Sequence, residues 1–249
     1  MALKLQARAM KYLIVAAGIL GFALRTVLYT TGIDDKGLLV AGHWVDSGVF
    51  LLTAAVAAVL FLWCRNLTGE TGYADAFQPS ALRAAGSVVA GIAFLFSGNV
   101  AIPSPAFAVA EPALRLAAGA SLLWVGFCRF TGKQPQLLFH GCVCLYLGLR
   151  LVCQYRIWSV DPQIQNYCFF LGANICLLLA CYQLAAFDAG CGNHRKLWGS
   201  GLAAAYLSIL SLANCEEKLF LLGCSFWILT ALSNLTPPHR PKYVAHAPH

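Results

Sequence analysis

The sequence predicts an all-α polytopic membrane protein with eight transmembrane helices. Of its 249 residues, 59% are hydrophobic and only 11% are charged, whereas soluble domains carry about 25% charged residues. The mean hydropathy is +0.69, and apolar runs recur at about the 20-residue length that crosses the hydrocarbon core. This composition excludes a soluble globular enzyme, a disordered chain, a nucleic-acid-binding module and a small disulfide scaffold.

The apolar runs set the expected helices. The run that starts the chain follows Lys4, Arg8 and Lys11, as a signal peptide would, but it continues past Arg25 with no cleavage site after it, so we expect a retained helix. The third, fourth and seventh runs are the weakest candidates, because they are rich in Ala and Gly rather than in Leu and Ile. The small residues of the third and seventh runs would let helices approach closely. The eight expected helices cover about residues 11–30, 44–64, 81–101, 109–129, 136–155, 165–187, 196–214 and 217–236.

The distribution of Lys and Arg predicts the orientation. The opposite loops hold only Lys36, Arg156 and Lys218, whereas eleven basic residues fall on one side of the predicted helices. The positive-inside rule places the richer side, and with it both termini, in the cytoplasm. The eleven are Lys4, Arg8, Lys11, Arg65, Arg83, Arg129, Lys133, Arg195, Lys196, Arg240 and Lys242.

A weak internal similarity predicts two parallel four-helix repeats. Residues 20–27 align with residues 145–152 at an offset of 125, and four of the eight positions are identical, including Arg25 and Arg150. Four helices per copy would give both copies the same orientation, as in parallel-repeat transporters. The expected organisation is a first repeat over residues 1–135, a second over 136–236 and a disordered cytoplasmic tail over 237–249.

Charged residues inside apolar runs are the candidate site residues, because a charge near the bilayer centre costs about 2.5–3.5 kcal/mol on insertion scales. Arg25 and Arg150 fall in the outer half, and Glu111 and Arg115 form an i,i+4 pair at the start of the fourth run. We expect Arg25 to pair with Glu111, with Asp46 as a competing partner. Arg150 is expected to pair with Glu216 or Glu217.

Metal and cofactor sites are not expected. His140 and Cys144 share a helix face, but tetrahedral zinc would need further ligands from other helices. The eleven cysteines are scattered through apolar runs and are odd in number, which is typical of reduced, packed thiols rather than of disulfides. Motifs typical of nucleotide-binding proteins and of hydrolases are also missing from the sequence positions where they would indicate such an activity.

The sequence leaves two functions open. The favoured one is a structural or regulatory membrane protein that binds a partner protein or lipid, with the charged residues as intramembrane ion pairs. The alternative is a small transporter or permease, with an outward-facing site between the repeats for an anionic or zwitterionic small molecule. An enzyme is least favoured, because no nucleophile, base and metal ligands converge. The expected surroundings are a lipid bilayer, most simply a bacterial cytoplasmic membrane, and no nucleic acid.

Overall fold

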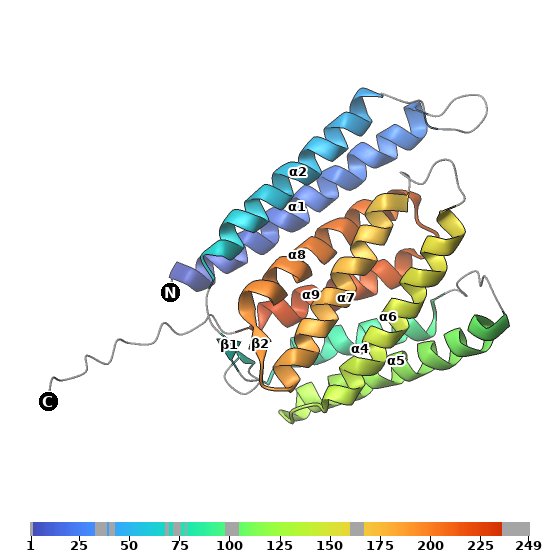
Figure 1. The fold of residues 1–249 in the computed structure, drawn as a ribbon. Coiled ribbons are helices and arrows are strands. Elements are labelled where there is room, and N and C mark those ends of the chain that lie inside the picture. The colour runs from blue at the N-terminus through green and yellow to red at the C-terminus, as the bar shows by residue number, and fades with distance from the viewer. Residues whose placement is uncertain are drawn as a thin grey trace, which may run out of the picture.

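The computed structural model describes residues 2–32, 39, 43–67, 70–71, 76–77, 79–97, 105–159 and 167–235. The tail predicted over residues 237–249 lies outside this range. In the described part the chain is almost entirely helical (Figure 1). Its α-helices are α1 (Ala2–Thr31), α2 (Trp44–Arg65), α4 (Ala81–Leu95), α5 (Pro105–Thr131), α6 (Leu137–Trp158), α7 (Cys168–Asp188), α8 (His194–Ser211) and α9 (Lys218–Ser233).

A 3-10 helix and a ribbon of two short strands lie between these helices. The 3-10 helix η2 (Leu212–Asn214) continues α8, and strands β1 (Glu70–Thr71) and β2 (Gly192–Asn193) form an antiparallel ribbon. Asn193 caps α8, because its side-chain oxygen accepts a hydrogen bond from the Lys196 N–H at 3.1 Å. The ribbon therefore ends directly at the start of a helix.

Six of the helices are long and apolar enough to cross a membrane. The exceptions are α4 and α9, with 15 and 16 residues. At 1.5 Å per residue they reach about 23 and 24 Å, short of the roughly 30 Å hydrocarbon core. The expectation of eight full-length spans is therefore met for six helices only. The two short helices pack against each other, and each also keeps an exposed apolar face, with Val89 and Ile92 on α4 and Leu219 and Leu222 on α9.

The first four helices do not form a compact unit of their own. The α1–α2 hairpin lies at one edge of the bundle and the α4–α5 hairpin at the opposite edge, with helices of the second half between them (Figure 1). Accordingly α1 packs on α8, and α4 packs on α9. Helices from the two halves of the chain are thus interleaved, and the two repeats stay a prediction. Local sequence similarity carries no information about which helices become neighbours.

Both ends of the described chain lie at the same end of the bundle. The Lys11 ammonium donates a hydrogen bond to the Ser233 hydroxyl at 2.8 Å, which joins the start of α1 to the last turn of α9. The β1–β2 ribbon lies at this end as well (Figure 1). Following the predicted orientation, we call it the inner end and the opposite one the outer end.

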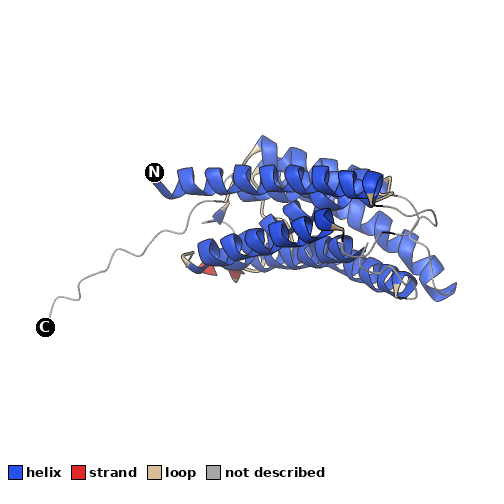
Figure 2. Cartoon of the chain, turned by 90° about the horizontal axis from the view of Figure 1, so that it is seen from above, coloured by secondary structure: helices blue, strands red, loops and turns tan. Residues whose placement is uncertain are grey.

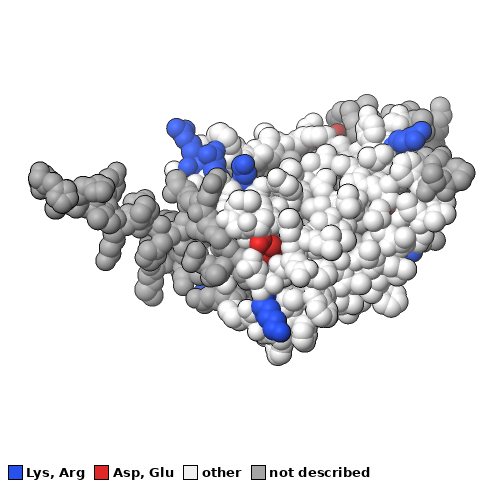
Figure 3. Space-filling view, turned by 60° about the horizontal axis from the view of Figure 1, so that its bottom comes forward, with Lys and Arg blue, Asp and Glu red and all other residues white. Residues whose placement is uncertain are grey.

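The outer surface of the bundle suits a lipid environment. The helices run roughly along one common direction (Figure 2), and few charged side chains interrupt the face shown in Figure 3. Large apolar side chains such as Phe61, Leu138 and Leu145 are more than 60% exposed. Extended apolar surface of this kind is costly in water and favourable in a bilayer.

Small residues allow the close helix contacts that the sequence predicts for the third and seventh runs. The most extensive interhelical contacts involve α4, which packs on α5 and α9, and α8, which packs on α7, α1 and α9. At Gly86 of α4, an added Cβ would overlap the Thr230 hydroxyl and lie 2.9 Å from the Thr230 Cβ. The Thr230 side chain cannot turn away freely, because it donates to the Trp227 carbonyl at 2.8 Å.

We expect Gly86→Ala to lower the free energy of unfolding by about 1–3 kcal/mol, because the methyl group would force α4 and α9 apart. Gly48→Ala is the matched control, since nothing lies within 4 Å of an added Cβ on that face of α2. The control should be neutral or slightly stabilising, because Ala favours a helix over Gly. Unfolding in mixed micelles of rising SDS content measures both variants. Equal midpoints for the two would contradict the α4–α9 packing.

Candidate functional site

Arg25 is buried near the outer end of α1, where it joins that helix to the last turn of α8 and to the start of α7. Its guanidinium donates to the Tyr29 hydroxyl at 2.8 Å and to the Leu210 carbonyl at 3.5 Å. It also lies 4.9 Å from the centre of the Phe169 ring, close enough for a cation–π interaction. The arginine predicted to be functionally informative is thus held on several sides by second-half residues.

Arg150 is fully buried in α6 and forms an ion pair with Glu217 at the start of α9. The expectation that Arg150 pairs with Glu216 or Glu217 is confirmed for Glu217, whereas Glu216 is exposed. Arg150 also donates to the Tyr146 hydroxyl at 3.2 Å, and its guanidinium lies 3.9 Å from the Phe220 ring centre. These contacts desolvate the cation and fix its direction toward Glu217.

The expected pairing of Arg25 with Glu111 is wrong. Glu111 belongs to α5, which lies at the opposite edge of the bundle from α1 (Figure 1). Its carboxylate instead lies 3.9 Å from Arg115, as the i,i+4 spacing predicts. Arg115 in turn donates to the Ser97 carbonyl at 2.6 Å and so ties α5 to the end of α4. Asp46 stands in the first turn of α2, where a carboxylate stabilises the helix N-terminus.

A polar pocket of about 260 Å³ lies beside Arg25 at the outer end. Arg150 does not line it, but its partner Glu217 does, so both arginines influence the pocket in different ways. The pocket collects side chains from α1, from α6, from the start of α7 and from the α8–α9 connection. Its lining residues are Arg25, Gln154, Trp158, Tyr167, Phe170, Ser211, Asn214, Cys215, Glu216 and Glu217.

Aromatic rings form one wall of this outer pocket. The rings of Trp158 and Tyr167 stack with centres 4.5 Å apart, and Phe170 meets Trp158 edge-on at 5.3 Å. Aromatic faces attract cations, whereas the guanidinium of Arg25 attracts carboxylates. The wall and Arg25 therefore offer complementary sites for the two charges of a zwitterion. Sequence reasoning missed the wall, because its members come from two helices.

Cys215 is a thiol in the same pocket and lies between α8 and α9. Burial is the main cause that raises the pKa of Cys215 to about 11; Glu216 adds to the shift, while Arg150, Lys218 and Arg25 oppose it. The reactive thiolate is therefore a small fraction at neutral pH. Alkylation of Cys215 should be slow at pH 7 and should rise about tenfold per pH unit up to that pKa.

A second buried polar cluster lies at the inner end, and the sequence did not predict it. Asp188, the last residue of α7, contacts Arg129 of α5 at 3.6 Å and His140 of α6 at 2.5 Å. All three side chains are almost completely buried. The sequence places Arg129 and Asp188 in loops between the predicted helices. Nothing in it indicates that they meet, because the segments that contain them are distant along the chain. The cluster is recognised only in the structure, where the ends of α5, α6 and α7 lie together.

Aromatic rings enclose the cationic side of this inner cluster. The guanidinium of Arg83 lies 3.5 Å from the ring centre of Phe77, and that of Arg129 lies 5.3 Å from it. His140 stacks on Trp227 at 6.2 Å. Within the described residues, no three His, Cys, Asp or Glu side chains come together as a metal site. Through Asp188 the cluster joins the inner ends of α5, α6 and α7.

Together the apolar helices define a multi-pass, all-α integral membrane protein. No known protein family, curated protein or solved structure matches this chain. Its function therefore has to be argued from the geometry of its own residues.

Proposed function

We propose that this membrane protein binds a small zwitterionic solute in the outer pocket, as a permease or solute-binding protein would. The observation that supports the proposal is the lining of one pocket by Arg25 and by the carboxylates of Glu216 and Glu217. The pocket volume of about 260 Å³ is slightly below the range of about 300–1,000 Å³ that holds drug-sized ligands. It suits a solute with few heavy atoms.

The charges around the pocket favour a zwitterion over a simple anion. Arg25 and Arg150 are balanced by Glu216 and Glu217, of which Glu217 is engaged with Arg150. A carboxylate on Arg25 would leave Glu216 and the aromatic wall for an ammonium group. A simple anion would interact with Arg25 and meet Glu216 unfavourably, and a simple cation would meet the positive charge of Arg25 unfavourably.

A structural or regulatory protein is the second candidate, favoured by the ion pairs that lie inside the bundle. The ion pair of Arg150 and Glu217 links α6 to the start of α9. Arg115, which is paired with Glu111 on its own helix, links α5 to the end of α4 through the Ser97 carbonyl. In this reading the polar side chains maintain the architecture, and the outer pocket takes no solute. The same experiment separates the two candidates.

The test uses Cys215 as a reporter in a variant that keeps this cysteine alone. A membrane-impermeant maleimide is added at pH 9 to intact cells, with glycine betaine, acetate or choline as the competing solute. Glycine betaine should protect Cys215, whereas acetate and choline at the same concentration should not. Labelling that none of the three solutes changes would favour the structural candidate.

Two variants of this reporter identify the binding groups. Arg25→Gln should weaken protection by glycine betaine about 10- to 100-fold, because a hydrogen bond to a charged group contributes about 1.5–3 kcal/mol. Glu216 is exposed, so Glu216→Gln should fold normally. It should also weaken protection by glycine betaine, but by a smaller factor than Arg25→Gln. A variant that keeps only Cys191, an exposed inner-end thiol, should react only in permeabilised cells and be insensitive to the solutes.

A further inference from the structure

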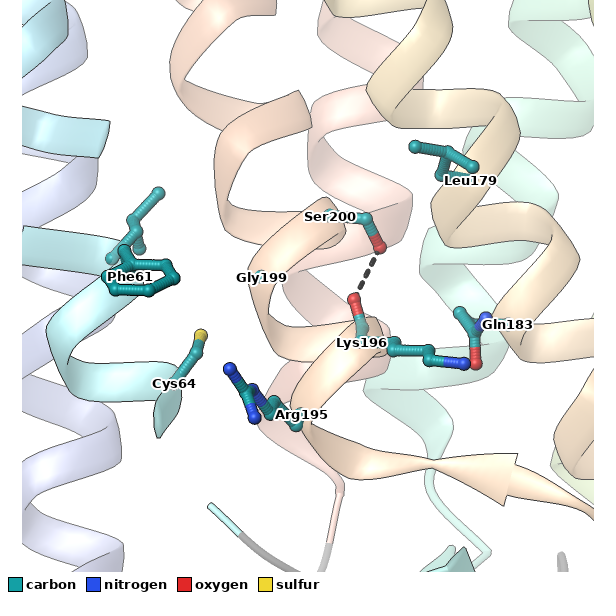
Figure 4. A pocket seen from close by; sticks show the side chains of 9 residues that line it. Phe61, Cys64, Leu179, Gln183, Arg195, Lys196, Gly199 and Ser200 are labelled. Atoms are coloured by element: carbon teal, nitrogen blue, oxygen red, sulfur yellow. Dashed lines mark hydrogen bonds between the residues drawn. The ribbon is translucent and has the colours of Figure 1, made fainter. Parts of the chain in front are cut away.

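A second hollow, of about 380 Å³, lies at the inner end and far from the outer pocket. It is a groove that runs over α8, with α2 on one side and α7 on the other (Figure 4). The groove exists because α2 and α7 both flank α8, and the small residues Gly199 and Ser200 form its floor.

The walls of this groove are apolar and face outward from the bundle. Phe61 of α2 is 62% exposed, and Leu179 of α7 is 50% exposed. Ser200 adds little polarity, because its hydroxyl donates to the Lys196 carbonyl of its own helix at 2.8 Å. In a chain with membrane-spanning helices, such walls offer a surface for a hydrocarbon chain.

Two cations stand at the inner mouth of the groove. Arg195 and Lys196 occupy the first turn of α8, and both are exposed. In Figure 4 the Arg195 guanidinium points toward α2, while the Lys196 ammonium reaches toward Gln183. Among the described residues that line the groove, none is acidic. The nearby carboxylate of Asp188 is buried against Arg129 and His140. The mouth is thus positively charged, and the α8 dipole adds to it.

We propose that this inner groove binds an anionic phospholipid of the cytoplasmic leaflet. The phosphate lies between Arg195 and Lys196, and an acyl chain lies along Phe61 and Leu179. Basic pockets between membrane helices on the cytoplasmic side are suited to such headgroups. The apolar walls favour a lipid over a free anion, because inorganic phosphate would leave them uncovered. This site is independent of the outer pocket.

The test measures lipid binding to the purified full-length chain by native mass spectrometry in detergent. Phosphatidylglycerol is titrated against phosphatidylcholine, and inorganic phosphate is the arm for a free anion. Phosphatidylglycerol should bind more tightly than phosphatidylcholine. In the double variant Arg195→Gln/Lys196→Gln its affinity should fall about 30-fold, because each basic residue near an anionic headgroup has a substantial share in the attraction. The affinity for phosphatidylcholine should change little.

The matched control is the double variant Arg65→Gln/Lys133→Gln, which removes two exposed cations from the same end but outside the groove. It should keep the preference for phosphatidylglycerol. Ser200→Leu fills the floor without loss of an interhelical bond and should weaken both lipids. Equal affinity for the two lipids, displacement of the lipid by equimolar inorganic phosphate, or an equal loss in the control would overturn the proposal.

Discussion

Asp188→Ala is expected to lower the free energy of unfolding by about 3–5 kcal/mol, because it removes the carboxylate that faces two buried groups. Arg129 lies 3.6 Å from Asp188 and His140 lies 2.5 Å from it, and all three are almost fully buried. The loss of one partner leaves a buried charge without its counter-charge, which costs far more than the pair itself contributes. SDS-induced unfolding in mixed micelles measures the loss.

A second substitution tests whether charge compensation is the cause. Arg129→Met in the Asp188→Ala background should recover a large part of the stability, because a buried ion pair can often be replaced by apolar groups at little cost. Lys133→Gln is an exposed control near the same end and should change stability by less than about 0.5 kcal/mol. If Asp188→Ala were as mild as this control, the inner cluster would not clamp the three helices.

Glu217→Gln should have the second large effect, a loss of about 3 kcal/mol, because Arg150 is completely buried and directs its guanidinium at this carboxylate. The effect should be slightly smaller than that of Asp188→Ala, since the Glu217 side chain keeps 19% of its surface exposed and water screens it in part. The same unfolding titration measures it, and the outer pocket should lose part of its shape.

Glu216→Gln is the matched control for this prediction. The two glutamates are adjacent, but Glu216 is exposed whereas Glu217 contacts a buried arginine. The control should stay within about 0.5 kcal/mol of the unchanged protein. Equal losses in the two variants would mean that the negative charge of the segment matters, and that the specific contact with Arg150 does not.

Short-range contacts of the candidate site residues were predictable from the sequence, and long-range ones were not. The Glu111–Arg115 contact follows from four-residue spacing on one helix, and Glu217 was one of two glutamates expected to meet Arg150. Tyr29 lies four residues from Arg25 on the same helix, but the other partners of Arg25 could not be predicted, because Phe169 and Leu210 come from helices far along the chain. Depth in a membrane shows that a charge needs a partner, but it does not show which helix supplies one.

Hydropathy and charge were enough to establish that this chain is a membrane protein and where its helices lie. Both are properties of consecutive residues, so a window of about 20 residues contains the whole signal. The neighbours of each helix arise from side-chain packing between distant segments. The α1–α2 hairpin on α8, the burial of short α4 against α9, the inner cluster at Asp188 and the groove at Arg195 all follow from that packing. Small residues in α4 and α8 predict close contacts but not the partner helices, and the inner cluster and the groove have no local sequence signal.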